Sequence, residues 1–523
     1  MKDLVILAEP QAPLPLTTVS PILSQLGVKS YLVGGALRDW LLGRDIVDID
    51  IAVSGNALEI GAKVAAALGG RYVLLDEANM LSRVVMVCEE HRWQVDFGTL
   101  RGSIEQDLAQ RDFTIDAMAV DLSQIGAEQT GIELVDPFQG WSDLRRGVIR
   151  AVTETAFASD AIRLLRAVRL AAELGFTIDR ETEALIRRYS HLVGSVAGER
   201  VREEWLRLLA VSGTEGLWHY LDELGLVTAM IPELAQAKGV TQPKEHFWDI
   251  FDHSLETVDA VDFLLRRGEW KHASGEVLAA VPWSAALAQY FDLPVSHGSN
   301  RRVLLKLAVL LHDVAKPQTR TIDANGRIRF LGHAKEGAVM VASILERLRF
   351  SAKEIRLAEI LVRYHLRPTQ MSNGGLPTRR AIYRYFRDTG EAGIDILFLS
   401  LADHLATRGP HLDPGEWQEH IQMVEYVLRQ RFQEERLVTP PKLIDGHDLI
   451  KIFGMSPGRR VGELLEAVRE AQATGEVSTR EEALSFLNLL LKSPPDSVYS
   501  KEEAEGEKQD GLPSKRLHDN CLR

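Results

Sequence analysis

The chain has 523 residues, and this length predicts several domains rather than one core. Its two cysteines exclude a disulfide framework and favour a reducing, cytoplasmic compartment, and no apolar stretch approaches the roughly 20 residues that span a bilayer, so no membrane partner is expected. The formal net charge of −13 excludes a surface uniformly adapted to nucleic acid, so any RNA contact requires clustered Lys and Arg.

The N-terminal third of the chain predicts a small α/β domain. Residues 1–20 are rich in Pro and Leu without periodicity, and we expect a loose lead-in there. Between 22 and 150, short apolar runs alternate with helical stretches. The runs expected to be strands are SYLVGG, DIDIAV, RYVLL, SRVVMVC and RWQVDFGTL.

The rest of the chain predicts helices. Residues 151–240 are helical in pattern and rich in Arg, and 241–410 form a longer helical region that holds most of the histidines. A Pro-marked segment at 437–449 leads into the helical end of a C-terminal domain, 411–493. Residues 494–523 are polar and are expected to be disordered. The predicted fold class is therefore α+β and multidomain, with a small α/β head followed by all-helical domains.

The run DIDIAV predicts a metal site in the head. Asp48 and Asp50 lie two residues apart in a strand, so both side chains point to the same face. Adjacent carboxylates repel unless a cation lies between them, which favours Mg²⁺. Asp96, on the later run WQVDFGTL, is the candidate for a third catalytic carboxylate. Such a site can support in-line phosphoryl transfer.

A pair of glycines precedes this strand. Gly34 and Gly35 let backbone N–H groups approach a triphosphate, and Arg38 can pair with it. Gly-Gly alone is usually a turn, and D-x-D alone is common. Their combination, in the order strand, Gly-Gly, helix with Arg-Asp and then D-x-D, is what makes the pattern specific.

Five segments in this order resemble the motifs of the tRNA nucleotidyltransferase and poly(A) polymerase superfamily, in its bacterial class. They are LVGGALRDWLLGRDIVDIDIAV (32–53), EQDLAQRDFTIDAMAVDL (105–122), DPFQGWSDLRRGVIRAV (136–152), SDAIRLLRAVRLAAELGF (159–176) and GERVREEW (198–205). The resemblance implies that 22–150 is the nucleotidyltransferase head, that 151–240 is a neck that reads the nucleotide and binds RNA, and that Asp48 and Asp50 bind Mg²⁺. The candidate nucleotide contacts are Gly34, Gly35, Arg38, Arg111, Asp112, Asp160, Arg163, Arg166 and Arg169.

The neck offers a protein-made template for the base. Asp160 and Arg163 are expected to be i, i+3 neighbours on one helix, with Arg166 and Arg169 extending the stripe. The carboxylate can accept from the amino group of cytosine or adenine while Arg donates to the ring nitrogen. Uracil and guanine present an oxygen there instead, so discrimination can be large. The alternative is an amphipathic helix with a solvated Arg face.

Two departures from the family pattern stand out. Ser159 occupies the position where Glu is usual before Asp160, which is expected to loosen the bracing of the template. Only a few residues around Gly102 remain where members that add the complete C-C-A carry a flexible loop. In the family, loss of this loop is linked to addition of two cytidines, so we expect C-C addition.

A second constellation lies in 241–410. The segments FDHSLETV (251–258), LAVLLHDVAKPQTR (307–320), FLGHAKEGA (330–338), LVRYHLRP (361–368) and SLADHLATRG (400–409) contain, in order, His253, His312, Asp313, His333, His365 and Asp403. Imidazole and carboxylate ligands on successive helices suit a divalent transition metal and an activated water. The pattern resembles the HD-domain metal phosphohydrolases, and His333 and His365 match members that hold two metals.

The resulting hypothesis is a metal-dependent enzyme that uses CTP, and ATP for a full C-C-A end, to extend tRNA, with a second phosphatase or phosphodiesterase activity in the HD domain. The C-terminal helices at 411–493 are expected to contact the tRNA. One alternative is a bacterial poly(A) polymerase, which would normally end in a basic segment, whereas this end is mixed and acidic. Another is an HD phosphohydrolase whose head only senses nucleotide. The number of nucleotides added, the metals of the HD site and the oligomeric state stay open.

Overall fold

The computed structural model describes residues 2–6, 14–46, 48–88, 91–125, 131–213, 215–372, 375–433 and 441–492. The chain forms two compact units. One consists of Met1–Val211 and Leu217–Pro232, and the other of Ser212–Gly216 and Glu233–Arg523. The chain therefore passes from one unit to the other at 211–212, 216–217 and 232–233. The disorder expected for 494–523 concerns residues outside the described part of the chain.

The first unit begins with a mixed sheet that has eight strands among the described residues, in the order β1-β8-β7-β2-β3-β6-β5-β4. The strands are β1 (Lys2–Ile6), β2 (Ser30–Val33), β3 (Asp48–Val53), β4 (Arg71–Asp76), β5 (Leu81–Cys88), β6 (His91–Thr99), β7 (Ala119–Asp121) and β8 (Gly131–Val135). The five strands expected from apolar runs are all present. Only β3 and β6 pair in parallel, and the other neighbours in this sheet are antiparallel.

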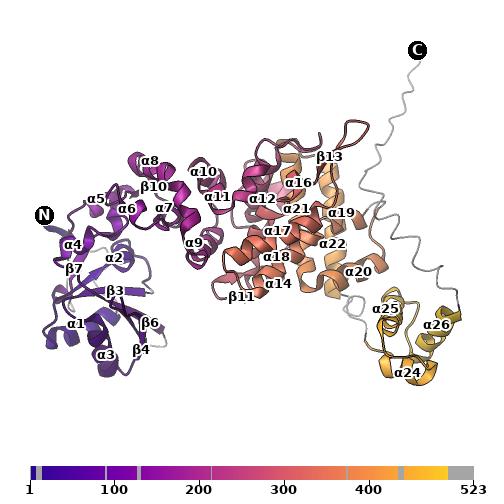
Figure 1. Cartoon of the computed structure of the whole chain (residues 1–523), viewed down its shortest axis with the longest axis horizontal. Coiled ribbons are helices and arrows are strands. Elements are labelled where there is room, and N and C mark those ends of the chain that lie inside the picture. The colour runs from indigo at the N-terminus through magenta and orange to yellow at the C-terminus, as the bar shows by residue number, and fades with distance from the viewer. Residues whose placement is uncertain are drawn as a thin grey trace, which may run out of the picture. The chain divides into compact units, whose positions relative to one another are not determined.

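The loose lead-in expected for 1–20 is wrong for the described residues. Lys2–Ile6 pairs with β8 at the edge of the sheet, and a helix begins at Leu14. The helices of this region are α1 (Leu14–Gln25), α2 (Gly34–Leu41), α3 (Ala57–Leu68), α4 (Ile104–Leu108) and α5 (Gly140–Arg146). α1 and α3 pack together on the sheet (Figure 1). α3 begins where Asn56 accepts the N–H groups of Leu58 and Glu59.

The connection between β6 and α4 consists of only Leu100–Ser103. Ser103 and Gln106 form a capping box that starts α4. Gly102 has φ +78°, and a Cβ there would overlap the Gln106 side chain. The short linker predicted around Gly102 is therefore a tight, capped turn.

The neck continues the first unit as helices. Its elements are β9 (Val148–Ile149), α6 (Ala156–Ser159), α7 (Arg163–Leu174), β10 (Thr177–Ile178), α8 (Arg180–Tyr189), α9 (Gly198–Ala210), α10 (Leu217–Glu223) and α11 (Leu226–Met230). β9 and β10 form a small parallel pair. The expectation that Asp160 and Arg163 share one helix is wrong. Asp160 has φ −154° and ψ 101°, an extended conformation that separates α6 from α7.

The second unit is a helical bundle with short antiparallel strand pairs between some of its helices. Its elements are α12 (Ile250–Leu264), α13 (Gly275–Ala279), α14 (Ala285–Asp292), β11 (Pro294–Ser296), β12 (Ser299–Asn300), α15 (Arg301–Leu311), α16 (Lys316–Thr319), β13 (Arg320–Ile322), β14 (Ile328–Phe330), α17 (His333–Arg347), α18 (Ala352–Tyr364), α19 (Arg367–Met371), α20 (Arg379–Thr389), α21 (Gly393–Arg408) and α22 (Pro414–Gln433). α12 and α15 are buried on nearly every side, and α21 packs against both. Side chains of these helices meet at the bundle centre.

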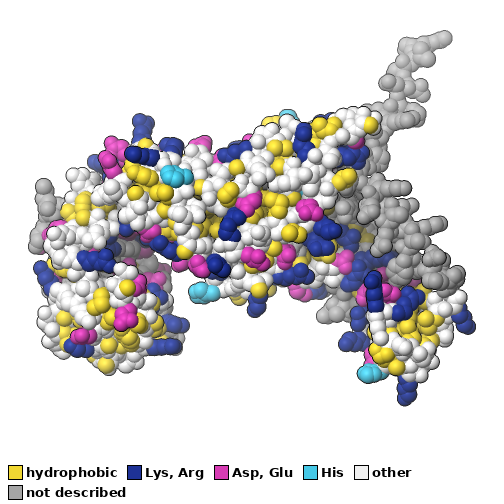
Figure 2. All heavy atoms as spheres, viewed as in Figure 1, with side chains coloured by type: hydrophobic (Ala, Val, Ile, Leu, Met, Phe, Trp, Pro, Cys, Tyr) yellow, Lys and Arg dark blue, Asp and Glu magenta, His cyan; other side chains and the backbone are white. Residues whose placement is uncertain are grey.

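The C-terminal helices have a core of their own. α24 (Gly446–Phe453), α25 (Arg459–Thr474) and α26 (Arg480–Lys492) enclose a cluster that includes Leu449, Leu464 and Leu487. Figure 2 shows Lys and Arg side chains around the surface of these helices. Among the arginines of these helices that form ion pairs within the described residues, Arg459 has the most exposed side chain, at 94%. Within the described ranges, no helix is both long and apolar enough to span a membrane.

Candidate active sites

Three predicted carboxylates gather on one face of the head sheet. Asp50 on β3 lies opposite Asp96 on β6 in parallel register, so their side chains share a face. Asp48 precedes Asp50 by two residues in β3, so its side chain points to the same face. Ile49 and Ile51, which alternate with the two aspartates along β3, are buried at 0% and 1% exposure. The alternation expected from DIDIAV is therefore present, and it turns the carboxylates away from the core.

An arginine that the sequence did not single out closes this row. Arg83 on β5 pairs with Asp96 in the sheet register, and its Nε and Nη2 donate to the two Asp96 oxygens at 2.7 and 2.8 Å. A bidentate pair of this kind fixes the plane of the carboxylate. Asp50, Asp96 and Arg83 thus form one row across three strands.

Gly34 lies against the same carboxylates. A Cβ at this position would lie 3.0 Å from the Asp50 Oδ2 and 2.9 Å from the Arg111 Nη1, and its φ is +70°. Only glycine suits both conditions. Burial raises the pKa of Asp50 to about 6 even though the Arg111 charge lowers it. The Arg111 Nη2 also lies 3.6 Å from the Asp107 Oδ2, so the charge of Arg111 is shared between Asp50 and Asp107.

Arg38 was expected to pair with a triphosphate, but in the structure its guanidinium is bonded to two aspartates. Its side chain is buried, with Nε and Nη2 on Asp39 and Nη1 on Asp116 at 2.9 Å. The neighbouring Gly35 would bring a Cβ within 3.4 Å of the Arg38 guanidinium. Arg38 therefore holds the start of α2 to the segment around Asp116, and contact between Gly35 or Arg38 and a nucleotide stays a prediction.

The predicted template pair meets other partners. Asp160 accepts two hydrogen bonds from Arg200 on α9, at 2.9 and 2.8 Å. Arg163 donates to the Gln110 carbonyl at 2.7 Å and more weakly to the Arg111 carbonyl. Arg163 is thereby held beside Arg111, and Asp160 is held by the neck. The pairing with Arg200 was not predicted, because nothing in the spacing indicates it.

The remaining arginines of the stripe are internal. Glu204 on α9 accepts from Arg166 at 3.1 Å and from Arg169 at 2.5 Å. Arg166 also donates to Asp112 at 2.9 Å. Arg166 and Arg169 do continue the stripe along α7, but Arg169 is 4% exposed, and contact of either residue with a nucleotide stays a prediction. These two arginines join α7 to α9, and Asp112 is the partner of Arg166 from the head.

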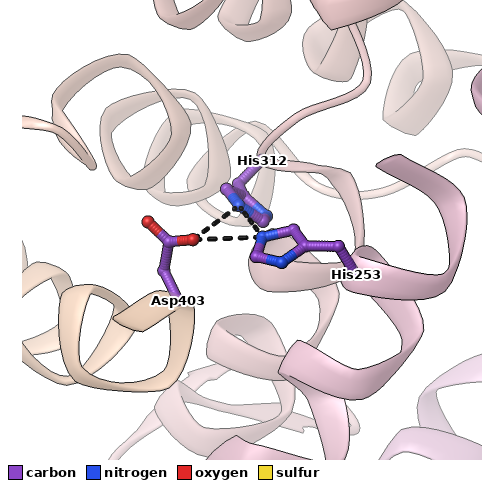
Figure 3. Close-up of side chains that lie close together, drawn as sticks. All are labelled: His253, His312 and Asp403. Carbon is purple, nitrogen blue, oxygen red and sulfur yellow. Dashed lines mark hydrogen bonds and ion pairs between the residues drawn. The ribbon is translucent and has the colours of Figure 1, made fainter. Parts of the chain in front are cut away.

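The predicted histidines and aspartates of the second unit do come together. His253 on α12, His312 at the end of α15 and Asp403 on α21 direct their side chains to one point (Figure 3). The Asp403 Oδ1 lies 3.0 Å from the His253 Nε2 and 3.6 Å from the His312 Nε2. The two Nε2 atoms are 3.4 Å apart. These three residues come from helices that are far apart in the chain.

Asp313, His333 and His365 form a neighbouring group. The Nε2 atoms of His333 and His365 are 3.2 Å apart, and the Asp313 Oδ1 lies 3.4 Å from the first. The Asp313 Oδ2 lies 3.2 Å from the His312 Nε2 of the other group. Asp313 is therefore placed between the two groups, with one oxygen facing each.

The donor set fits divalent metal. The Nδ1 atoms of His312, His333 and His365 lie 2.6, 2.7 and 2.6 Å from main-chain carbonyls three residues earlier. A carbonyl can only accept, so Nδ1 carries the proton and Nε2 presents a lone pair to the centre. Several lone pairs converging on one point repel unless a cation lies there.

Two further polar residues line this centre and were missed in the sequence. The Lys316 Nζ lies 2.6 Å from the Asp313 Oδ2 and donates to Gln242 at 2.6 Å. The ring of His246 lies 5.7 Å from that of His253, and burial, with the Lys316 charge, lowers the pKa of His246 to about 3. Lys316 could have been found, since it follows Asp313 by three residues; His246 had no such signal.

A head with paired carboxylates beside glycine, in one chain with a helical bundle that groups His and Asp as candidate metal ligands, fits a multidomain enzyme of phosphoryl chemistry. Family models match along the chain in the same order. They are "Poly A polymerase head domain" (30–150), "Probable RNA and SrmB-binding site of polymerase A" (175–238), "HD domain" (276–408) and the second domain of tRNA nucleotidyltransferases (414–487). His253 lies before the matched HD range.

Relatives match over nearly their whole length. The A-adding tRNA nucleotidyltransferase of Deinococcus radiodurans is 34% identical over 89% of this chain and 96% of its own. The CC-adding tRNA nucleotidyltransferases of Thermus thermophilus and Geobacter sulfurreducens are 32% and 33% identical over 88% and 93% of this chain and 93% and 97% of theirs. The chain belongs to the tRNA nucleotidyltransferase family, and it is a nucleotidyltransferase.

Solved structures share the fold. The Thermotoga maritima CCA-adding enzyme complexed with tRNA superposes with a TM-score of 0.58 and 22% identity, covering 94% of this chain and 100% of that one. A CCA-adding enzyme with ATP gives a TM-score of 0.59 at 22% identity, over 91% and 95% of the two chains. The predicted order of an α/β head followed by helical domains is confirmed.

Proposed function

We propose that this chain extends the 3′ end of tRNA with CMP taken from CTP, in a reaction that requires Mg²⁺. The observation that carries the proposal is the row formed by Asp50, Asp96 and Arg83, with Gly34 at its edge. It offers carboxylates for a divalent cation beside a glycine, whose backbone N–H would approach a triphosphate. The names of the relatives supply the substrate, and a tRNA substrate implies the cytoplasmic location expected from the cysteines.

The roles of the residues follow from their positions. Asp48 and Asp50 would hold Mg²⁺, and Asp96 is oriented by Arg83 to complete the site. When bound, the metal supplies charge stabilisation to the attacking and leaving oxygens of an in-line displacement at phosphorus. Arg111, whose Nη1 lies beside Gly34 and Asp50, would supply positive charge to the phosphates. Asp160 and Arg163 would face the cytosine edge.

The product we propose is C-C. The short, capped connection at Leu100–Ser103 supports it, because these four residues leave no room at this position for a flexible loop that could reshape the site for adenine. A second candidate is the addition of A to tRNA that already ends in C-C, which the name of the Deinococcus radiodurans relative favours. A full C-C-A enzyme requires both reactions in one chain.

The test uses three purified tRNAs, ending at the discriminator base, in C and in C-C, each with CTP, ATP or both, followed by sequencing of the 3′ ends. If the proposal is right, the first two tRNAs are extended until they end in C-C, and the third is not extended. Extension of only the third tRNA by A would establish the second candidate. No extension of any tRNA would overturn the assignment.

We also propose that the bundle centre holds two divalent metals and hydrolyses phosphate esters. His253, His312 and Asp403 would hold one, Asp313, His333 and His365 the other, and Asp313 would join them. Lys316 lies where it can meet a substrate phosphate. Metal analysis of the purified protein, together with hydrolysis of a 2′,3′-cyclic nucleotide and of p-nitrophenyl phosphate before and after chelation, tests this. Bound metal without hydrolysis of either would leave a structural metal site and overturn the hydrolase proposal.

A further inference from the structure

The environment of Asp160 has a feature that neither the motif nor the fold requires. Its main chain is extended between α6 and α7, so no helix fixes the direction of its side chain. Arg200, on a different helix, donates to both Asp160 oxygens at 2.9 and 2.8 Å. The side chain of Asp160 is still 29% exposed. The carboxylate is therefore open to a ligand and yet held in one orientation.

This ion pair contributes little to the stability of the fold. The Arg200 side chain is 50% exposed, and exposed pairs stabilise proteins only weakly. The pair does have a marked electrostatic effect. Although burial raises the pKa of Asp160, the hydrogen bonds and charge of Arg200 lower it below its ordinary value, which keeps the carboxylate ionised and able only to accept.

The remaining capacity of the carboxylate matches one more donor. An ionised carboxylate offers roughly four lone-pair sites. Arg200 uses two of them. The capacity that is left suits an N–H of an exocyclic amino group. A carbonyl oxygen brought to the same place would meet only lone pairs.

Ser159 cannot provide this bracing. Its hydroxyl donates to the Ala156 carbonyl at 2.9 Å, within its own turn, and accepts a weak contact from Arg163 at 3.4 Å. Arg163 itself is held by the Gln110 carbonyl. Each half of the template is thus held by a separate element: Arg163 by the head and Asp160 by α9.

We propose that Arg200 is a specificity-determining positioning residue, which holds the Asp160 carboxylate so that it accepts from the amino group of cytosine and rejects the oxygen of uracil. This inference rests on the proposed function. It assigns to the GERVREEW segment a part in base selection, through Asp160, in addition to joining α9 to α7.

The experiment measures kcat/KM for CTP and UTP on tRNA ending at the discriminator base, using full-length protein. Arg200→Ala should lower the CTP/UTP ratio by about 10-fold to 100-fold, the range expected for hydrogen bonds to a charged group. Arg200→Lys should recover part of the ratio, because Lys keeps the charge but cannot bind both oxygens in one plane. In an Asp160→Ala background, Arg200→Ala should change the ratio no further.

Arg207→Ala is the matched control. It removes an arginine from the same helix with 53% exposure, held by a single 3.4 Å contact to Glu173. Loss of tRNA affinity alone would slow CTP and UTP equally and leave the ratio unchanged. An unchanged ratio in Arg200→Ala, or a further fall in the Asp160→Ala background, would overturn the inference while leaving CMP addition established. If the unaltered protein adds no CMP, the proposed function and the inference fail together. If the Arg200→Ala protein does not fold, the CTP/UTP ratio of Arg200→Lys is compared with that of the unaltered protein instead.

Discussion

Asp50 and Asp96 lie side by side on neighbouring parallel strands, and only Asp96 is neutralised, by Arg83. Burial and the other carboxylates raise the pKa of Asp50 above its ordinary value, with Arg111 opposing them. The row therefore carries one balanced and one poorly compensated carboxylate. A divalent cation beside Asp50 would relieve this imbalance.

Asp50→Asn should reduce CMP addition by several orders of magnitude without unfolding the head, since it removes the charge that would hold the metal but keeps the shape. The measurement is single-turnover incorporation at saturating Mg²⁺, with a thermal unfolding curve beside it. Glu77→Gln, at an exposed turn of the same sheet, is the control for loss of one negative charge. Near-normal incorporation by Asp50→Asn would remove β3 from the reaction.

Glu204→Ala should lower the free energy of unfolding by about 3–5 kcal/mol, because it removes the buried carboxylate that Arg166 and the buried Arg169 share and leaves Arg169 with Glu173 alone of its two carboxylates. Urea unfolding measured by tryptophan fluorescence reports it, since Trp205 is buried in the same helix. Glu203→Ala, one residue away and exposed, should change stability by less than about 0.5 kcal/mol. Equal effects of the two would show that the Glu204 network is not what joins α7 to α9.

Asp259→Asn should stabilise the second unit most at high pH. Burial raises the pKa of Asp259 to about 7, with Glu256 and Asp262 adding to it while Lys306 and the Gly216 N–H oppose it. The unfolded chain releases this proton near pH 4. The folded state therefore binds the proton more tightly, and stability is lost as pH rises from about 4 to about 7.

The expected gain for Asp259→Asn is at most about 4 kcal/mol at pH 8 and falls towards zero at pH 4. Asparagine can still accept from Gly216, so the hydrogen bond is kept. Thermal unfolding across this pH range is the measurement, with the exposed Glu276→Gln as control. A gain that is the same at both ends of the range would contradict the raised pKa.

Replacing His312 and Asp313 by Ala should remove metal from the bundle centre and abolish hydrolysis of phosphate esters, while CMP addition changes by less than about 3-fold because its ligands lie in the other unit. Metal content by mass spectrometry and the two activities are measured on one preparation. His411→Ala, an exposed histidine outside the cluster, is the control. Collapse of CMP addition in a folded double variant would mean that the two sites are coupled.

Inserting a flexible loop from a full C-C-A enzyme between Arg101 and Gly102 should allow some A addition to tRNA ending in C-C. The position keeps the Ser103 capping box and so the start of α4. A loop of equal length between Glu77 and Ala78, in the turn after β4, controls for insertion itself. Efficient A addition by the unaltered protein would show that the short connection does not set the product.

The sequence was sufficient wherever one pattern governs one element. Alternation in DIDIAV predicted the faces of β3, and the ordered His and Asp residues predicted a cluster whose members span residues 253 to 403. The lead-in was misjudged because β1 depends on its pairing with β8, which no local pattern indicates. The extended residue Asp160 was hidden inside an otherwise continuous helical pattern.

Ion-pair partners were beyond prediction for a related reason. Arg83 is 13 residues from Asp96, and Arg200 is 40 residues from Asp160. Charged side chains are long and are common on every surface, so spacing cannot say which of many arginines reaches a given carboxylate. Lys316 differs because it shares a short turn with Asp313, and proximity in the chain would have sufficed.

The three crossings of the chain between its units restrict how the enzyme can be divided. A fragment that ends at Val211 would lose α10, whose Trp218 and Leu221 are 1% and 0% exposed and whose Tyr220 donates to Glu183 in the neck. A fragment that begins at Leu217 would lose Gly216, which donates to Asp259. No single cut separates the units cleanly. Removal or exchange of the second unit would therefore have to include Ser212–Gly216 as well as the chain from Glu233 onwards.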